Sequence, residues 1–367
     1  MTTFTHLHLS DMSHSGEFLE FVESATRHSH EWQTVDRAAL TKESTDGAIV
    51  TVHNSLDLLA EILARPSSGV IFFPHTNLVD RLSRDQWRSI VTSSSTRLDV
   101  VVGSTRSAAG FPTFSQGHVR IWVAPTYGFD TPPPRDDSGT EWDVAYFGRV
   151  DPDKCVHVVL DVADRAAREL DRVVRVLVVG PESFYAGAYW DRYCEPRISD
   201  RVQCDRSGWV TTSRFLHLLQ RCRAVVLPST SIWETWCRTG WQAALLGVPV
   251  FGPDWDGIAE IVRSQGHTPW PVRFTGGGFR DHSSLLGSTR LSLDDFNGYE
   301  VDPSSLDELL TTLVSDPPPV SYPAGRDHLW ARGTLENTLA SIAGGEDSPF
   351  APSAEFPSDL EHLTSCG

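Results

Sequence analysis

Short apolar runs rich in Val, Ile and Phe alternate with longer segments of helical periodicity along most of the chain. This alternation constrains the fold most, because it is typical of parallel strands joined by crossover helices. It starts again after residue 141, so the sequence predicts two α/β domains, each with a doubly wound parallel sheet. The expected strands cover residues 5–9, 32–35, 48–53, 69–74, 98–103 and 119–125, then 142–148, 174–180, 201–206, 224–229 and 248–253.

The boundary between the two domains is marked by "TPPPRDDSGTE", residues 131–141, which combines Pro, Gly and charge without periodicity. We therefore expect an N-terminal α/β domain over 1–130, this linker, and a C-terminal α/β domain over 142–322. A helix over 323–345 is expected to pack back towards the N-terminal domain. Residues 346–367 are rich in Gly, Pro and acid, which predicts a loose tail.

Composition excludes several classes of protein. The formal net charge of −17 argues against a nucleic-acid-binding surface, which needs an excess of Lys and Arg on one face. The six cysteines lack the spacing of a zinc site, and no cluster of acids and histidines suggests another metal. The N-terminus does not resemble a signal peptide, and no apolar run approaches the roughly 18 residues of a transmembrane segment. We expect a cytoplasmic protein; the sequence carries no signal for its oligomeric state.

Two cations lie close together in "AYFGRVDPDK", residues 145–154, between an expected strand and an expected helix. Lys154 is one of only two lysines among 31 lysines and arginines, and Arg149 lies five residues before it. Ligands of doubly wound sheets gather beyond the carboxyl ends of the strands. A diphosphate would be held there by charge-assisted hydrogen bonds of about 1.5 to 3 kcal/mol each. The alternative is a solvated loop in which Asp151 and Asp153 pair with the cations.

A second candidate segment, "WETWCRTGWQAALLG", follows the expected strand at 224–229. Glu234 is expected at or just before a helix N-terminus, where capping and the helix dipole already favour a carboxylate. The same position would suit a sugar diphosphate. Glu234 would then accept hydrogen bonds from sugar hydroxyls, and the amides of Thr235, Trp236 and Cys237 would bind phosphate.

These segments occur in a serial order that resembles a known family. "AYFGRVDPDK", "VLVVGPES", "SGWVTTSRFLHLLQRCRAVVLPS", "WETWCRTGWQAALLGVPVFG" and "NGYEVDPSSLDELLTTLV" are similar to the C-terminal domain of group 1 glycosyltransferases, retaining enzymes of family 4 with the GT-B fold. The resemblance covers about residues 142–315. It implies two Rossmann-like domains that face each other across a cleft, with 1–130 as the acceptor domain and 142–322 as the nucleotide-sugar donor domain. It also implies a nucleoside-diphosphate sugar, first of all a UDP-sugar, as substrate, with no cofactor and no metal.

The resemblance assigns roles to single residues. Arg149 and Lys154 match the cations that hold the donor diphosphate, and Glu234 matches the first acid of a Glu, seven residues, Glu signature, which faces the donor sugar. Gln242 replaces the second Glu, which usually accepts hydrogen bonds from the ribose, so one acceptor is kept and the charge is lost. Cys155 and Cys237 stand where the family usually has glycine. The full donor-binding set implied is Gly16, Gly148, Arg149, Lys154, Val210, Glu234, Thr235, Trp236, Cys237 and Gln242.

The first half resembles the family more faintly. Gly16 follows the first expected strand, and His75 in "GVIFFPHTNLVD" matches a histidine that often ends a strand beside the donor sugar. His53 in "VTVHNS" is the competing candidate, and both could equally be packed or surface histidines. The resemblance thus implies a catalytic set of His75, Glu234, Arg149 and Lys154.

The function implied is that of a retaining hexosyltransferase or glycosyltransferase of the EC 2.4 type. In this family transfer is generally pictured as a front-face displacement, in which the protein stabilises the leaving diphosphate and orients an acceptor hydroxyl. The acceptor is expected to be a small molecule or a glycoconjugate, in specialised-metabolite or glycoconjugate biosynthesis. Two alternatives stay open: a catalytically silent GT-B partner protein, and another nucleotide-sugar enzyme on this fold, such as an epimerase or a pseudo-glycosyl coupling enzyme.

Overall fold

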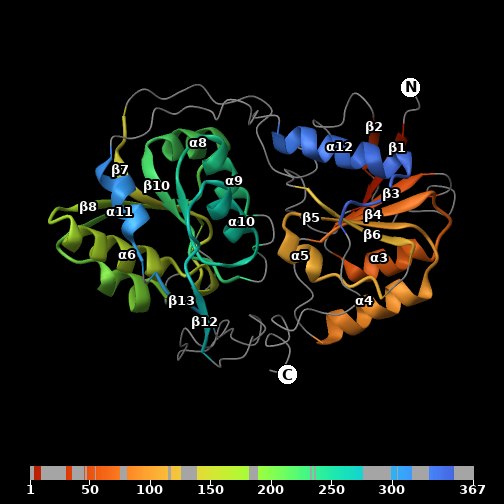
Figure 1. Ribbon diagram of the computed structural model, residues 1–367, viewed down its shortest axis with the longest axis horizontal. Coiled ribbons are helices and arrows are strands. Elements are labelled where there is room, and N and C mark those ends of the chain that lie inside the picture. Colours follow the sequence, from red (N-terminus) through yellow and green to blue (C-terminus); the bar gives the residue numbers. More distant parts are fainter. Residues whose placement is uncertain are drawn as a thin grey trace. The chain divides into compact units, whose positions relative to one another are not determined.

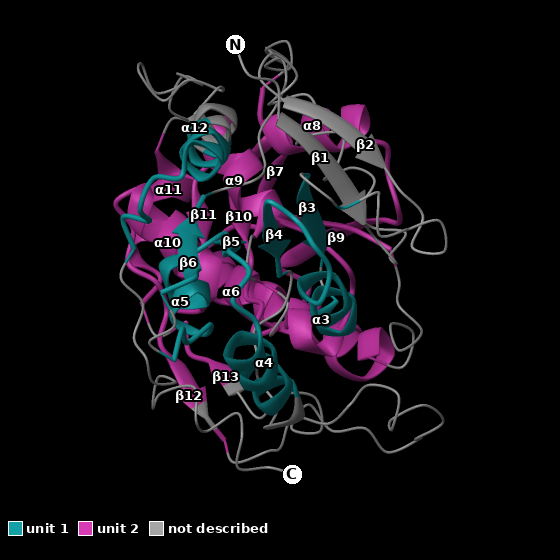
Figure 2. Ribbon diagram, turned by 90° about the vertical axis from the view of Figure 1, so that its right-hand side faces the viewer, with its two compact units in different colours: residues 1–130, 328–367 teal, residues 131–327 magenta. Residues whose placement is uncertain are grey.

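Figure 1 shows the computed structural model of the chain. It divides into two compact units, which are coloured separately in Figure 2. Unit 1 comprises residues 1–130 and 328–367, and unit 2 comprises residues 131–327. Most of the expected linker and of the expected loose tail lies outside the described residues. These are 4–9, 30–34, 45, 48–53, 55–74, 81–114, 117–124, 139–181, 189–231, 234, 237–275, 299–303, 305–315 and 330–350.

Unit 1 is built on a parallel sheet with the strand order β2-β1-β3-β4-β5-β6. Every residue of β3, β4 and β5 is buried, as expected for strands whose two faces are both covered. The six strands expected in this half are confirmed. They are β1 (Phe4–Leu9), β2 (His30–Thr34), β3 (Ile49–His53), β4 (Gly69–Phe73), β5 (Leu98–Val102) and β6 (Val119–Val123).

Helices cover both faces of this sheet. Figure 1 shows α12 on one side and α3 with α4 on the other. Ser55 caps the N-terminus of α3, because its Oγ accepts a hydrogen bond from the Leu58 amide at 3.2 Å, and the apolar stripe of the helix faces the core. The described helices of unit 1 are α3 (Leu56–Leu63), α4 (Arg81–Ser93), α5 (Thr105–Ala109) and α12 (Trp330–Gly344).

A buried carboxylate ties α12 to the sheet of unit 1. Asp99 on β5 is 1% exposed and accepts hydrogen bonds from Arg97 Nε at 3.1 Å and Arg120 Nε at 2.7 Å. The same two guanidinium groups also donate to main-chain carbonyls at the C-terminal end of α12 and just beyond it. Arg97 reaches Ile342 at 2.8 Å, and Arg120 reaches Glu346. One acid therefore orients two cations that hold a helix more than 200 residues away in sequence.

Unit 2 is built on a second parallel sheet, with the order β11-β10-β7-β8-β9. The central strand β7 is buried along its whole length. The five strands expected in this half are confirmed. They are β7 (Trp142–Phe147), β8 (Val174–Val179), β9 (Val202–Ser207), β10 (Cys222–Val226) and β11 (Val250–Phe251).

The helices of unit 2 follow the expected pattern. Helix α6 buries Ala163, Ala166 and Ala167, small side chains that allow close packing of the helix. The described α-helices are α6 (Val156–Glu169), α8 (Thr212–Gln220), α9 (Arg238–Leu245), α10 (Asp256–Ser264) and α11 (Asp307–Val314). No helix in the described part of the chain is long and apolar enough to cross a membrane.

An antiparallel pair of short strands in unit 2 was not expected from the sequence. Strand β12 (Val272–Phe274) pairs with β13 (Tyr299–Val301), with Arg273 opposite Glu300. Three residues are too few for an alternating pattern to stand out, which explains why periodicity missed them.

Candidate functional site

The two cationic and acidic segments singled out in the sequence follow adjacent strands of the unit 2 sheet. Strands β7 and β10 pair in parallel, with Val144 opposite Ala224. The loops that follow the two strands therefore start at the same edge of the sheet. The loop after β7 leads through a 3₁₀ turn (Pro152–Lys154) into α6. The loop after β10 leads into α9. A hydrogen bond from the Thr230 amide to the Asp153 carbonyl, 3.0 Å long, joins the two loops.

Lys154 and Glu234, 80 residues apart, form an ion pair at this edge. Both side chains are largely buried, with 12% and 17% of their surface exposed. Burial lowers the pKa of Lys154, but the carboxylates of Glu234 and Asp153 outweigh burial and raise the pKa above its ordinary value. Lys154 is therefore charged at neutral pH. Glu234 does not cap α9, because that helix begins at Arg238.

Arg149 forms an ion pair with Asp151, as in the solvated-loop alternative, and 43% of its side chain is exposed. That alternative does not hold for Asp153. Lys154 forms its ion pair with Glu234 and not with Asp153. The Asp153 side chain is only 3% exposed, and its Oδ1 has no hydrogen-bond partner among the described residues. In sequence, Asp151 and Asp153 flank Pro152 as an Asp-x-Asp triplet. Within the described residues, no group of three or more His, Cys, Asp or Glu side chains could hold a metal ion.

Tyr146 on β7 holds the main chain of the turn that contains Arg149. Its hydroxyl donates a hydrogen bond to the Arg149 carbonyl at 2.6 Å, and the ring is buried. Burial raises the pKa of Tyr146 well above its usual value, and the carboxylates of Glu234, Asp153 and Asp151 raise it further. The phenol is therefore neutral and acts as a hydrogen-bond donor that fixes the main chain of Arg149.

Two glycines allow the backbone to approach closely at this edge. A Cβ atom on Gly180, at the end of β8, would lie 1.7 Å from the Gly148 carbonyl oxygen. A Cβ atom on Gly148 would lie 2.7 Å from the Tyr146 hydroxyl. Since real Cβ atoms do not come so close, only glycine fits at both positions. Gly148 belonged to the expected donor-binding set, whereas Gly180 did not, although it ends the neighbouring strand.

Cys155 and Cys237 lie at the N-cap positions of α6 and α9, and both have left-handed backbone conformations, with φ of 52° and 42°. These are positions where the resemblance leads one to expect glycine. The backbone keeps the conformation that glycine adopts freely, at a cost of about 1–2 kcal/mol for another residue. Both thiols are buried, and burial raises the pKa of Cys155 to about 11 and that of Cys237 well above its ordinary value.

The other donor-binding candidates of unit 2 lie further from this ion pair. Val210 follows β9, two strands from β7 in the sheet, or about 10 Å at the usual strand spacing. Gln242 is half-buried on α9, and its side-chain amide has no recorded hydrogen bond to another described residue. Thr235 and Trp236 are outside the described residues.

In unit 1, Gly16 and His75 are likewise outside the described residues. The competing histidine, His53, ends β3 and is 3% exposed. Its ring stacks on Phe73 with 5.0 Å between ring centroids, which is a packing role.

Sequence reasoning missed three residues at this edge: Tyr146, Gly180 and Thr230. Tyr146 carried a weak signal, since a hydroxyl near the end of a buried strand needs a partner. Thr230 contacts Cys155 through its hydroxyl, 3.5 Å from the sulfur, a pairing that the sequence alone does not reveal.

Comparison with known proteins adds a family and a fold. Residues 132–268 match the family described as glycosyl transferases group 1. None of the curated proteins compared with the chain matches it.

Several solved structures share the fold. AviGT4, a glycosyltransferase involved in avilamycin A biosynthesis, is 17% identical, with a TM-score of 0.55 over 93% of this chain and 98% of its own. Anabaena Alr3699/HepE in complex with UDP is 16% identical, with a TM-score of 0.60 over 94% of this chain and 100% of its own. The N-terminal domain of trehalose-6-phosphate phosphatase from Candida albicans is 10% identical, with a TM-score of 0.52 over 93% of this chain and 94% of its own.

The two parallel sheets and these neighbours agree with the expected fold class. The chain has a GT-B fold of two Rossmann-like domains, and its residues 132–268 are similar to the group 1 glycosyltransferases.

Proposed function

We propose that this protein transfers a sugar from a nucleoside-diphosphate sugar, most directly a UDP-sugar, to an acceptor hydroxyl with retention of anomeric configuration, as enzymes of family 4 do. The observation that carries the proposal is the Lys154–Glu234 ion pair at the carboxyl ends of β7 and β10, with Arg149 in the same loop. This edge of a doubly wound sheet is where such folds bind nucleotides.

Charge at this edge favours an exchange of partners when the donor binds. Two cations, Arg149 and Lys154, lie among three carboxylates, Asp151, Asp153 and Glu234. A diphosphate would take Lys154 as a counter-ion and release Glu234 to accept hydrogen bonds from sugar hydroxyls. The first turns of α6 and α9 add main-chain N–H groups, which favour an anion at a helix N-terminus.

The same groups would stabilise the leaving diphosphate during transfer. Loss of one such donor typically lowers the rate about 100-fold or more. In this scheme the protein orients the donor and the acceptor hydroxyl and supplies no covalent nucleophile. The Alr3699/HepE structures contain UDP alone, UDP with glucose, or UDP-glucose, which supports a UDP-sugar as the first donor to test.

Binding tests the diphosphate contact. We expect Lys154→Ala to weaken UDP binding at least 10-fold and to leave uridine binding unchanged, because only UDP presents phosphates to the lysine. Arg149→Ala should act in the same direction and less strongly, since that side chain is more exposed. Arg263→Ala, which removes an exposed cation paired with Asp254, is the matched control. Equal losses for UDP and uridine in Lys154→Ala would contradict phosphate contact.

Product analysis tests the reaction. Incubation with UDP-glucose and a panel of acceptors should release UDP and form a glycoside whose anomeric proton coupling equals that of the donor. An isomerised donor without a glycoside would indicate an epimerase instead. Absence of binding to UDP, GDP and dTDP would favour the silent partner protein. Gln242→Glu should tighten UDP and uridine binding alike if this position contacts the ribose.

A further inference from the structure

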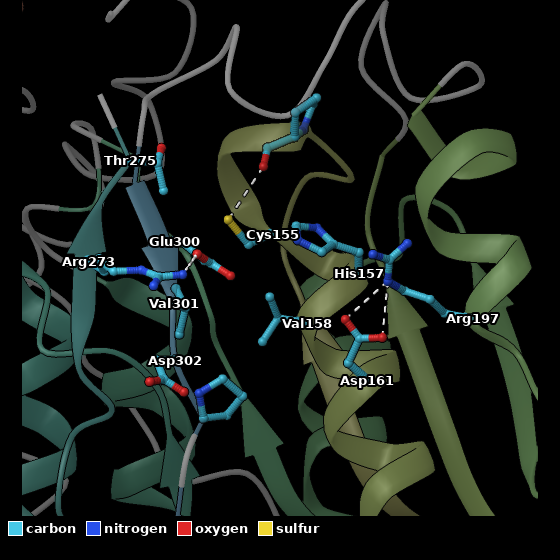
Figure 3. Close-up of a pocket in the computed structure, with 12 residues that line it drawn as sticks. Cys155, His157, Val158, Asp161, Arg197, Arg273, Thr275, Glu300, Val301 and Asp302 are labelled. Atoms are coloured by element: carbon cyan, nitrogen blue, oxygen red, sulfur yellow. Dashed lines mark hydrogen bonds and ion pairs between the residues drawn. The ribbon is translucent and has the colours of Figure 1, made fainter. Parts of the chain in front are cut away.

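Unit 2 contains a pocket of about 510 Å³ between the start of α6 and the β12–β13 strand pair (Figure 3). It shares Pro152 and Cys155 with the turn that carries Lys154. Neither Lys154 nor Glu234 lines it, so it is a separate cavity beside the proposed diphosphate site.

Paired charges form two walls of this pocket. Asp161 on α6 accepts a hydrogen bond from Arg197 Nε at 3.0 Å, and Arg273 on β12 pairs with Glu300 on β13. Asp302 lines the pocket next to this second pair. Figure 3 shows the first pair on the helix side and the second on the strand side. Each wall therefore presents hydrogen-bond donors and acceptors next to each other.

The helix-side wall also contains a neutral imidazole, that of His157 on α6. His157 Nδ1 is 2.8 Å from the Tyr189 hydroxyl, which also accepts a hydrogen bond from the His157 amide at 3.0 Å. Burial, together with the nearby Arg197 charge, lowers the pKa of His157 to about 3. The ring is therefore uncharged at neutral pH and adds polarity to the pocket without charge.

Apolar groups complete the lining. Val158 on α6 and Val301 on β13 are both buried, and Pro152 and Pro303 also line the pocket. The lining thus joins small apolar surfaces to several hydrogen-bonding groups, the combination that holds a molecule with a C–H face and a hydroxyl edge.

We propose that this pocket binds a neutral polyhydroxylic ligand, a saccharide of one or two rings, at a site separate from the proposed donor site. Vicinal hydroxyls both donate and accept, so they match carboxylate and guanidinium groups that stand side by side. The inference concerns binding alone and does not depend on sugar transfer by the protein.

The charge balance decides against the other ligand classes. Three carboxylates and two guanidiniums give the lining a formal charge of −1, and both guanidiniums already have carboxylate partners. An anion would have to displace an acid from Arg197 or Arg273, which are 32% and 73% exposed against 12% for Lys154, so water would screen much of the gain. A cation would find most of the acid groups already paired. A purely apolar ligand would cover part of the charged groups without offering them hydrogen bonds, which is costly.

Titration of the whole protein with maltose, sucrose and trehalose, followed by saturation-transfer NMR, tests the inference. At least one of these sugars should bind in the millimolar range. Thr275→Trp, which places an indole in the pocket, should weaken that binding at least 10-fold. Thr311→Trp adds the same side chain on the exposed side of α11 and should leave binding unchanged. Binding of UDP to both variants shows that unit 2 is folded.

Lys154→Ala separates this inference from the proposed function. It should lose UDP binding and keep sugar binding, because Lys154 does not line the pocket. No binding of any of the three sugars at tens of millimolar would overturn the inference. So would sugar binding that Thr275→Trp leaves intact, or a preference for spermidine over all three sugars. Failure of UDP to bind while a sugar still binds would count against the proposed function only.

Discussion

Cys155 and Cys237 keep left-handed backbone conformations without being glycine, and the thiol of each packs against a neighbouring residue. Cys237 Sγ lies over Gly240, where a Cβ atom would come within 2.9 Å of the sulfur. The sulfur of Cys155 lies 3.5 Å from the hydroxyl of Thr230. Both thiols are buried in these contacts. At both positions the main chain has a conformation that glycine adopts at no steric cost.

His157 should make stability depend on pH. Its pKa is about 3 in the folded protein and near 6.5 in the unfolded chain, so the unfolded state takes up the proton first as pH falls. The contribution is present above pH 6.5 and is lost as pH falls towards 3. We expect the wild type to lose about 1–2 kcal/mol more than His157→Gln between pH 7 and 5. Urea unfolding at these pH values measures the difference, and parallel losses in the two proteins would contradict it.

The turn between β7 and α6 depends on the end of its neighbour, β8. Gly180→Ala would push the Gly148 carbonyl away and move the main chain of Arg149. We expect at least a 10-fold loss of UDP affinity, because the arginine and the following turn would shift together. Gly208→Ala, at the end of β9, is the matched control, since its added methyl group meets no described atom within 4 Å. Unchanged UDP affinity in Gly180→Ala would show that the turn adapts.

Helix α12 should depend on the carboxylate of Asp99. Asp99→Ala would leave Arg120, only 11% exposed, without its counter-ion, and removing one partner of a buried pair costs about 3–5 kcal/mol. Hydrogen exchange should then show loss of protection in α12 and the end of β6. Asp254→Ala, which breaks an exposed pair with Arg263, should cost less than about 1 kcal/mol. Protection of α12 that survives Asp99→Ala would assign its anchoring to apolar contacts alone.

The sequence predicted the strands of both sheets because central parallel strands are apolar on both faces and short turns bound them. β3, for example, is buried at every residue. It did not predict β12 and β13, whose residues owe their conformation to each other across an interval of 24 residues. An element of three residues takes its structure from its partner, and that partner cannot be read from local pattern.

Topology decides which candidate residues lie at the same edge of the sheet, but it does not decide which side chains pair there. Lys154 and Glu234 follow adjacent strands of one sheet, and an ion pair joins them. Which carboxylate would pair with which cation was not predictable from sequence, since Asp151, Asp153 and Glu234 all lie within reach. The pairing depends on which acid the fold buries beside the lysine.

At the scale of the whole molecule, the chain order sets which part should fold alone. Unit 2 is one continuous segment, residues 131–327, whereas unit 1 needs residues 328–367 as well. We expect the fragment 131–327 to unfold cooperatively and to bind UDP within about 10-fold of the full chain, because the ion pair and its loops lie inside it. A fragment of residues 1–130 should unfold at a lower denaturant concentration than the fragment 131–327. Leu335, Leu339 and Ile342 would be missing from its core. A molten 131–327 fragment would contradict this division of stability.

Because the sequence contains only two lysines, chemical labelling of Lys154 can report on the state of its ion pair. An amine-directed reagent has only Lys42, Lys154 and the chain terminus to modify, and Lys154 is protected both by burial and by the proton that its carboxylate neighbours hold on it. Peptide mapping can therefore follow this single amine without mutagenesis. A rise in its labelling would mark release from Glu234 into solvent, and a further fall would mark an arriving anion.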